Sequence, residues 1–336
     1  MKAVRILLIV VGLLLSGLLI AALVLPKGYE VSRSVEINAP KKLTHRYISH
    51  MKLMDKWSPW NELDPNQKKT FEGEDGKPGS VSRWEGNSDA GKGSQEIKAV
   101  SPEKVDYVVT FEKPFKSVSP VSLALAGDDM GPVTVTWAMK GEMPFPLNAM
   151  QLFMNMEKIL GADFEKGLGY LKKQLEAKAA DPEYNGYKVM LTELPGDLFV
   201  GKRVEISWAE MQGVFEKNHP LITRAITQAK GTAGHPSGIF YVWDTKNQRT
   251  DMMAAIPATG VTAVPGWEST RLSGPALKVE HFGAYSKVRP AYDALLECMA
   301  DFGLEEGTLV VEQYVIGPQQ EPDTSKWLTY IYNAVK

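Results

Sequence analysis

Cysteine is nearly absent from this sequence of 336 residues, and basic side chains do not outnumber acidic ones. The single cysteine, Cys298, excludes an intrachain disulfide and a cysteine-rich metal site, and its apolar neighbours indicate a buried helix position. With 38 basic and 40 acidic residues the formal charge is -2, so no broad basic surface is expected. Neither DNA nor RNA is therefore predicted as a partner.

Motifs for metal binding and catalysis are also scarce. The five histidines show no ligand spacing with acidic residues that would define a zinc site, so no metal or other cofactor is predicted. The sequence contains no Gly-x-Ser-x-Gly element. The glycine-rich residues 86–93 are not a phosphate-binding loop, because Gly93 stands where Ser or Thr would ligate magnesium and a strand pattern follows. These patterns nominate no catalytic residue.

A long apolar run is present at the N-terminus. Residues 6–25 are twenty consecutive residues without a charge, enough to cross a hydrocarbon core of about 30 Å. This exceeds the apolar run of about 7–15 residues in a cleaved signal peptide, so we expect residues 1–28 to form an uncleaved membrane anchor. Gly12 and Ser16 form a small-xxx-small pair that would suit a homodimer.

The charges flanking this run indicate its orientation. Lys2 and Arg5 precede it, and only Lys27 follows closely. The excess of positive charge on the cytoplasmic side of a span places the N-terminus in the cytoplasm. We therefore expect a single-pass membrane protein whose soluble domains are extracytoplasmic, on the periplasmic side of a bacterial inner membrane.

Residues 29–178 show the pattern of a first soluble domain of the α+β class. A strand at 31–37 and a helical segment at 41–54 precede a turn-rich stretch at 57–79. Alternating segments then predict an antiparallel sheet, with strands at 80–84, 95–100, 105–112, 118–126 and 133–139. Apolar residues at helical spacing over 147–175 predict a long amphipathic helix that packs on this sheet, with space for a cavity between them.

Residues 179–186 read as a linker, and residues 187–336 as a second domain. Its pattern of strand, helix, strand and strand occurs twice. The first copy covers 198–206, 208–228, 238–243 and 252–256, and the second covers 277–282, 286–302, 309–316 and 328–333. Such a duplication predicts two halves related by a pseudo-twofold axis, with a ligand groove between them.

One carboxylate interrupts the strand pattern at 309–316. Glu312 shares a face with Val310, Tyr314 and Ile316, because side chains alternate along a strand. A buried carboxylate needs a hydrogen-bonding or cationic partner, whereas a solvated strand face would need none. The strand by itself is compatible with both interpretations.

Aromatic residues supply candidate binding surfaces. In the first domain these are Trp60, Trp84 and Trp137, and Trp137 shares a face with Val133, Val135 and Met139. In the second domain a carboxylate among aromatic faces would suit an organic cation. The candidates there are Tyr241, Trp243, Tyr285, Tyr314 and Tyr332, beside Glu312. Core packing is the alternative explanation for each.

Residues 29–178 resemble the START-like (SRPBCC) superfamily of polyketide cyclases and lipid-transfer proteins. The resemblance lies in Ile37-Asn38-Ala39-Pro40, Trp57-Ser58-Pro59-Trp60, Gly91-Lys92-Gly93 and Thr134-Val135-Thr136-Trp137. It implies a helix-grip fold around a hydrophobic cavity.

Residues 187–336 are similar to the GyrI-like effector-binding domain of AraC-type regulators. The matching elements are Ser237-Gly238-Ile239-Phe240-Tyr241, Val279-Glu280-His281-Phe282-Gly283-Ala284-Tyr285, Val311-Glu312-Gln313-Tyr314 and Ile331-Tyr332-Asn333-Ala334-Val335. The resemblance implies that Glu312 lies in a ligand groove.

Together these features predict a membrane-anchored protein that binds small hydrophobic or amphipathic, cationic molecules, with a pocket in each soluble domain. The alternatives are a hydrolase that uses Glu312 as a general acid or base, a cyclase-like enzyme that uses the first cavity, and an interaction module of an envelope complex.

Overall fold

The computed structural model describes residues 2–336, without the side chain of Lys2, and divides them into two compact units. Unit 1 ends at Ala179, and unit 2 begins at Ala180. Met1, part of the expected anchor, lies outside the described residues. Both units combine helices with antiparallel sheets, which confirms the predicted α+β class.

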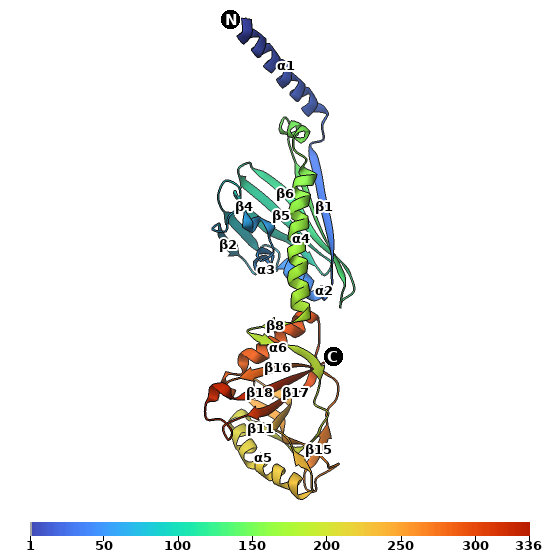
Figure 1. The fold of residues 1–336 in the computed structure, drawn as a ribbon, viewed down its shortest axis with the longest axis vertical. Coiled ribbons are helices and arrows are strands. Elements are labelled where there is room, and N and C mark those ends of the chain that lie inside the picture. Colours follow the sequence, from blue (N-terminus) through green and yellow to red (C-terminus); the bar gives the residue numbers. More distant parts are fainter. Residues whose placement is uncertain (1) are drawn as a thin grey trace. The chain divides into compact units, whose positions relative to one another are not determined.

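The elements of unit 1 are drawn from blue to green in Figure 1. They are α1 (Lys2–Val24), β1 (Gly28–Ile37), α2 (Lys41–Ser49), α3 (Met51–Asp55), η1 (Pro59–Glu62), β2 (Lys68–Glu72), β3 (Val81–Glu85), β4 (Lys92–Ser101), β5 (Lys104–Lys113), β6 (Ser117–Gly127), β7 (Val133–Glu142), η2 (Leu147–Leu152) and α4 (Met156–Ala180). The segment 3–24 of α1 is long and apolar enough to cross a membrane, with a mean hydropathy of 3.0.

A seven-stranded antiparallel sheet forms the body of unit 1, in the order β1-β7-β6-β5-β4-β3-β2. α4 lies along one face of this sheet (Figure 1). Along β7 the buried side chains alternate, so Val133, Val135, Trp137 and Met139 share one face, as predicted. The core contains these residues together with a stripe of α4 that includes Phe164, Leu168 and Leu171.

Two predicted helices of unit 1 differ from the observed ones. The helix expected at 41–54 is broken at His50, whose extended backbone separates α2 from α3. The helix expected over 147–175 is divided into η2 and α4, and α4 continues to Ala180. α4 is linked to β1 by Arg33, which donates hydrogen bonds to Glu157 (2.7 Å) and Glu165 (2.5 Å). A Cβ at Gly161 would lie 2.2 Å from the Arg33 guanidinium, so a side chain at this position would displace the end of Arg33.

Unit 2 is drawn from green to red in Figure 1. Its elements are β8 (Glu183–Tyr184), β9 (Tyr187–Lys188), β10 (Met190–Glu193), β11 (Leu198–Ser207), η3 (Trp208–Glu210), α5 (Met211–Gln228), β12 (Thr232–Ala233), β13 (Ser237–Asp244), β14 (Arg249–Thr259), β15 (Glu268–Arg271), β16 (Pro275–Phe282), η4 (Tyr285–Lys287), α6 (Arg289–Phe302), β17 (Glu306–Ile316), η5 (Thr324–Lys326) and β18 (Leu328–Val335). The segment expected as a linker carries the β8–β9 hairpin, with Asn185 and Gly186 at positive φ in its turn.

The main sheet of unit 2 has the order β10-β16-β18-β17-β13-β14-β11-β15, and β12 pairs with β14. The six strands from β16 to β11 are arranged symmetrically. In each half of this row, the strand that precedes the helix (β16 or β11) is outermost, and the last strand after the helix (β18 or β14) lies next to it. β13 and β17, the first strands of the main path after α5 and α6, pair antiparallel at its centre; the short β12, which precedes β13, lies off this path. Glu312 of β17 therefore lies beside Gly238 of β13, and on its other side beside Ile331 of β18.

α5 and α6 pack on the same face of this sheet. Residues that pair directly across neighbouring strands point to the same face of the sheet. Gly238, Glu312 and Ile331 therefore lie on one face. A Cβ at Gly238 would meet the Phe215 ring of α5 at 2.9 Å, and Ile331 packs in the core beneath α6. The opposite face holds a separate core that includes Phe199, Ile239 and Val311.

Candidate functional site

Glu312 lies on the helix-covered face of unit 2, between α5 and α6. Its side chain is partly buried and accepts two hydrogen bonds, from Tyr292 Oη of α6 at 2.5 Å and from Tyr314 Oη of β17 at 2.8 Å. The strand alternation brings Tyr314 to the same face, and helix packing brings Tyr292. The carboxylate is therefore held in a defined orientation by two phenol donors.

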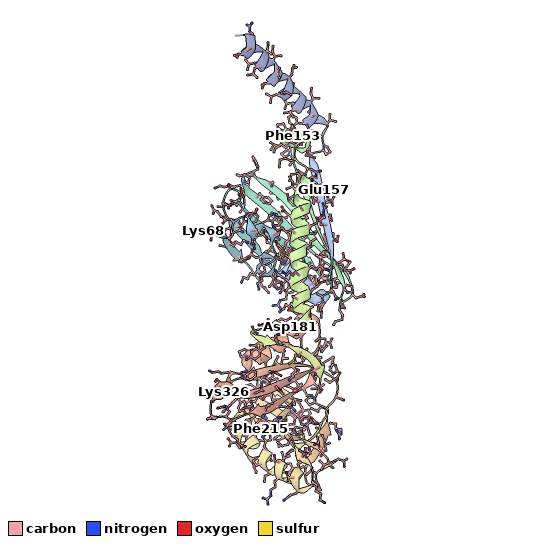
Figure 2. The ribbon with its side chains drawn as sticks, viewed as in Figure 1. Lys68, Phe153, Glu157, Asp181, Phe215 and Lys326 are labelled. Carbon is pink, nitrogen blue, oxygen red and sulfur yellow. The ribbon has the colours of Figure 1, made fainter. Side chains whose placement is uncertain are left out.

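Aromatic rings surround this carboxylate. Tyr314 contacts the rings of Phe215 and Tyr285, with centroids 5.7 and 5.2 Å away, and Tyr285 contacts Trp327 at 4.9 Å. Phe215 stacks on His219 one turn further along α5, at 5.0 Å. Phe215 is labelled in Figure 2. We call Glu312 with these rings the Glu312 cluster; it consists of Phe215, His219, Tyr285, Tyr292, Glu312, Tyr314 and Trp327.

Among the described residues, the carboxylate of Glu312 forms no ion pair with a lysine or arginine, and its hydrogen-bond donors are phenols. Burial raises the pKa of Glu312 above its ordinary value, while the hydrogen bonds from Tyr292 and Tyr314 and the nearby His281 lower it. Burial also lowers the pKa of His219, which favours its neutral form. The cluster thus holds a carboxylate whose charge is incompletely compensated.

His281 lies on the neighbouring strand β16 and is buried. Its Nε2 is 3.2 Å from the Ala284 carbonyl, and its Nδ1 is 2.9 Å from the Tyr187 hydroxyl. Because a carbonyl only accepts, Nε2 donates to Ala284, and Nδ1 forms its hydrogen bond with the Tyr187 hydroxyl. Both ring nitrogens are therefore occupied by partners within the protein.

The predicted site residues of unit 2 separate into two groups. Tyr285 and Tyr314 lie with Glu312, whereas Tyr241 and Tyr332 pack against the core on the opposite face. Trp243 is half-exposed and stacks on Trp208 at 4.8 Å.

The two tyrosines on the opposite face already meet cations of the protein. The Arg203 guanidinium lies 3.9 Å from the Tyr241 ring centroid, and Lys278 Nζ lies 5.8 Å from that of Tyr332. These contacts give Tyr241 and Tyr332 an internal role in cation–π packing.

The predicted tryptophans of unit 1 lie in packed surroundings. Trp137 stacks on Phe164 of α4 at 4.4 Å, and Trp57 and Trp60 meet its edge at 5.4 and 5.5 Å. Trp84 lies on another strand, β3, and contacts Phe111 of β5, with ring centroids 5.7 Å apart. Aromatic rings therefore fill the space between α4 and β7 at this point.

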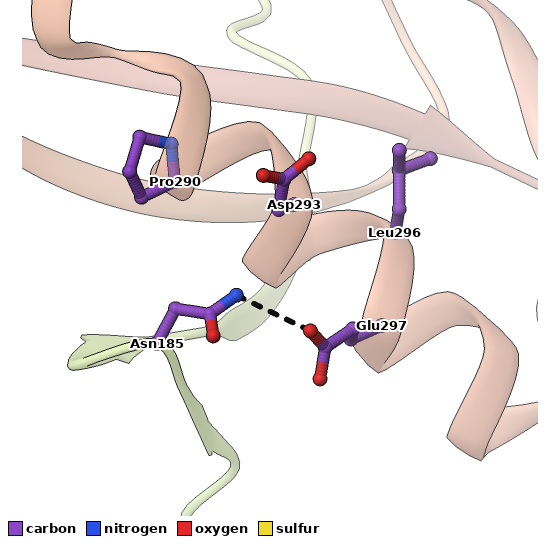
Figure 3. A pocket seen from close by; sticks show the side chains of 5 residues that line it. All are labelled: Asn185, Pro290, Asp293, Leu296 and Glu297. Atoms are coloured by element: carbon purple, nitrogen blue, oxygen red, sulfur yellow. Dashed lines mark hydrogen bonds between the residues drawn. The ribbon is translucent and has the colours of Figure 1, made fainter.

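Hollows in the surface lie elsewhere. One, of about 520 Å³, lies beside α6 and is lined by Asn185, Pro290, Asp293, Leu296 and Glu297, with Asn185 donating to Glu297 at 3.3 Å (Figure 3). Another, of about 790 Å³, is formed by β4, β5 and β6 and includes Phe111, Val118 and three lysines, but no residue of α4. No group of three or more acidic, histidine or cysteine side chains suited to a metal ion occurs within residues 2–336.

Four members of the Glu312 cluster were not predicted from the sequence: Phe215, His219, Tyr292 and Trp327. Phe215 and His219 are four residues apart, a helical spacing that places them on one face of α5. That spacing is the one sequence signal for them. Tyr292 and Trp327 reach the cluster through tertiary packing alone.

No curated protein matches this chain. Similar solved structures include the EcmrR C-terminal domain, 19% identical, with 45% of this chain and 98% of that chain covered and a TM-score of 0.38. They also include the major latex-like protein 151 of Panax ginseng, 18% identical, with 46% and 99% covered and a TM-score of 0.32.

The sequence of the first unit also matches a family model. This match spans the strands and the long helix that pack together in the core of unit 1. Residues 29–176 match the model of the family described as polyketide cyclase / dehydrase and lipid transport.

Proposed function

We propose that this chain is a membrane-anchored small-molecule-binding protein whose second unit binds an amphipathic organic cation at Glu312. The observation that carries the proposal is the Glu312 cluster. A partly buried carboxylate that forms no ion pair with a lysine or arginine of the described residues attracts a cation, and aromatic faces around it bind the apolar part of the same molecule.

The anchor and the identity of unit 2 are parts of this proposal. α1 would cross the bacterial inner membrane, and both units would follow on the periplasmic side, because Lys2 and Arg5 precede the span. Residues 187–336 would be a duplicated GyrI-like domain, which the mirrored strand order supports. The domain of unit 1 would bind an apolar or lipid-like molecule.

A matched pair of ligands tests the charge selection. Benzyltrimethylammonium and its uncharged carbon analogue neopentylbenzene have nearly the same shape. We expect the full chain in detergent to bind the cation at least about tenfold more tightly, since a desolvated cation–aromatic contact and a carboxylate each favour it. The measurement is isothermal titration calorimetry at neutral pH. Equal affinities for the two molecules would disprove selection by charge.

The binding should depend on pH in a defined direction. The protonated Glu312 is neutral, so cation affinity is full above the raised pKa of Glu312 and is lost as the pH falls through it. Replacing Tyr314 with phenylalanine removes a hydrogen bond that lowers this pKa, so the midpoint should move to higher pH. Calorimetric titrations across the acidic range measure both midpoints. An unchanged midpoint in Tyr314→Phe would contradict the assignment to Glu312.

The raised pKa of Glu312 also makes the stability of the folded protein depend on pH, in the direction opposite to that of cation binding. Because the folded state holds the Glu312 proton more tightly than the unfolded chain, the contribution of Glu312 to stability is most favourable below the ordinary value of 4.5. It declines as the pH rises through the raised pKa. A bound cation should offset this decline, which denaturation with and without benzyltrimethylammonium would reveal.

A further inference from the structure

The chain from the end of β7 to the first residue of α4 carries no charge over fourteen residues. Residues 143–156 lie between Glu142 and Glu157 and include eight large apolar side chains. Most of these are exposed: Phe153 is 77% exposed, Leu152 52% and Leu147 48%. Figure 2 labels Phe153 and Glu157 near the start of α4. Exposed apolar side chains concentrated in one uncharged segment indicate a surface that meets a nonpolar partner.

This segment is attached to the last turn of α1. The buried Asn148 side chain of η2 donates from Nδ2 to the carbonyls of Ala22 (2.7 Å) and Leu25 (3.0 Å). Gln151 Nε2 donates to the carbonyl of Pro26 at 2.7 Å. The bonds to Ala22 and Leu25 satisfy carbonyls that the end of a helix leaves without partners, and the bond to Pro26 fixes the chain just after it. η2 is therefore held at the level at which α1 ends.

A helix that crosses a membrane ends in the interface between lipid chains and headgroups. Groups hydrogen-bonded to Ala22 and Leu25 lie at that depth as well. Because neighbouring side chains of 143–156 are apolar and uncharged, they match the boundary of the acyl chains, where amphipathic segments lie in the membrane plane.

We propose that residues 143–156 form a second membrane contact, which inserts its exposed apolar side chains among the lipid acyl chains beside α1. This inference rests on the proposed insertion of α1. We assign the bilayer as the partner of this surface because the Asn148 and Gln151 bonds hold the segment beside the end of α1. The exposed apolar side chains of α1 and of the segment are thereby neighbours. Unit 1 would thereby be held on the membrane surface by two elements.

Site-specific fluorescence quenching tests the contact. In full-length protein carrying Cys298→Ser, single cysteines are introduced as Phe153→Cys, Phe115→Cys and Leu13→Cys and labelled with nitrobenzoxadiazole. Phe115 is a matched control because it is also a phenylalanine of unit 1, 70% exposed, but lies between Lys113 and Lys116. Leu13 lies within α1 and is 68% exposed.

Each protein is reconstituted in phosphatidylcholine vesicles with and without lipids that carry a nitroxide on the acyl chain. We expect the label at 153 to lose about half its fluorescence, as the label at 13 does, and the label at 115 to lose little, because interfacial segments lie about 5–10 Å deep. If the label at 13 is quenched but the labels at 153 and 115 are quenched equally little, this inference is wrong, while the proposed insertion of α1 is supported. Absence of quenching at 13 would overturn both. Energy transfer between copies at 153 without lipid quenching would also overturn it, in favour of a second chain as the occupant.

Discussion

Glu312→Gln is expected to weaken the binding of benzyltrimethylammonium by about 30-fold or more, since loss of one partner of a desolvated charge pair costs about 2 kcal/mol or more. Glutamine keeps the shape of the side chain but removes the negative charge. Its amide nitrogen also cannot accept the hydrogen bond that one of Tyr292 and Tyr314 donates. The affinity for neopentylbenzene should change far less, because this molecule uses the aromatic rings alone.

Glu306→Gln is the matched control for this prediction. Glu306 lies on the same strand, β17, but is exposed, so its replacement should leave both affinities unchanged. Calorimetry on the two variants with both ligands gives the comparison. Equal cation affinity in wild type and Glu312→Gln would contradict the role proposed for Glu312. If Glu312→Gln binds an ester as wild type does but no longer hydrolyses it, Glu312 would instead act in general acid–base catalysis.

Trp137→Ala should lower the free energy of unfolding of unit 1 by about 3–5 kcal/mol, the usual cost of truncating a large buried aromatic side chain. Trp137 is 5% exposed and contacts Trp57, Trp60 and Phe164. Its removal would leave a cavity that rigid aromatic neighbours on η1, α4 and the preceding turn fill poorly. The stacking of Trp137 on Phe164 would be lost as well.

Urea denaturation followed by far-ultraviolet circular dichroism measures this loss, and hydrogen exchange of the β7 amides assigns it to unit 1. Phe115→Ala is the control, because an exposed phenylalanine contributes little to the core. A loss in Trp137→Ala as small as that in Phe115→Ala would show that Trp137 is not part of a tightly packed core. It would then favour the interpretation of Trp137 as the wall of a ligand cavity.

Local periodicity was sufficient for much of the fold. The alternation in β7 predicted that Val133, Val135, Trp137 and Met139 share a buried face, and the structure confirms it. The short strands β2, β12 and β15 were not predicted, because their side chains lack a continuous apolar alternation and their pairing depends on neighbouring strands. The break at His50 was missed because the apolar spacing continues across it.

Aromatic residues show why the candidate site could not be predicted in full. Tyr241 and Tyr285 were both predicted as site residues, but Tyr241 lies beneath Arg203 on one face and Tyr285 beside Tyr314 on the other. The register shift between Phe240 and Val242 in β13 changes which side chains share a face after it. A sequence pattern does not contain this information.

The sequence by itself determined the features that depend on neighbouring residues: the apolar length of α1 and the common face of Glu312 and Tyr314 on one strand. Tertiary structure decided which distant side chains meet them. Tyr292 reaches Glu312 from α6, and Asn148 reaches the end of α1 from η2. The physical reason is that backbone geometry sets the direction of side chains within an element, whereas strand register and helix packing set the contacts between elements.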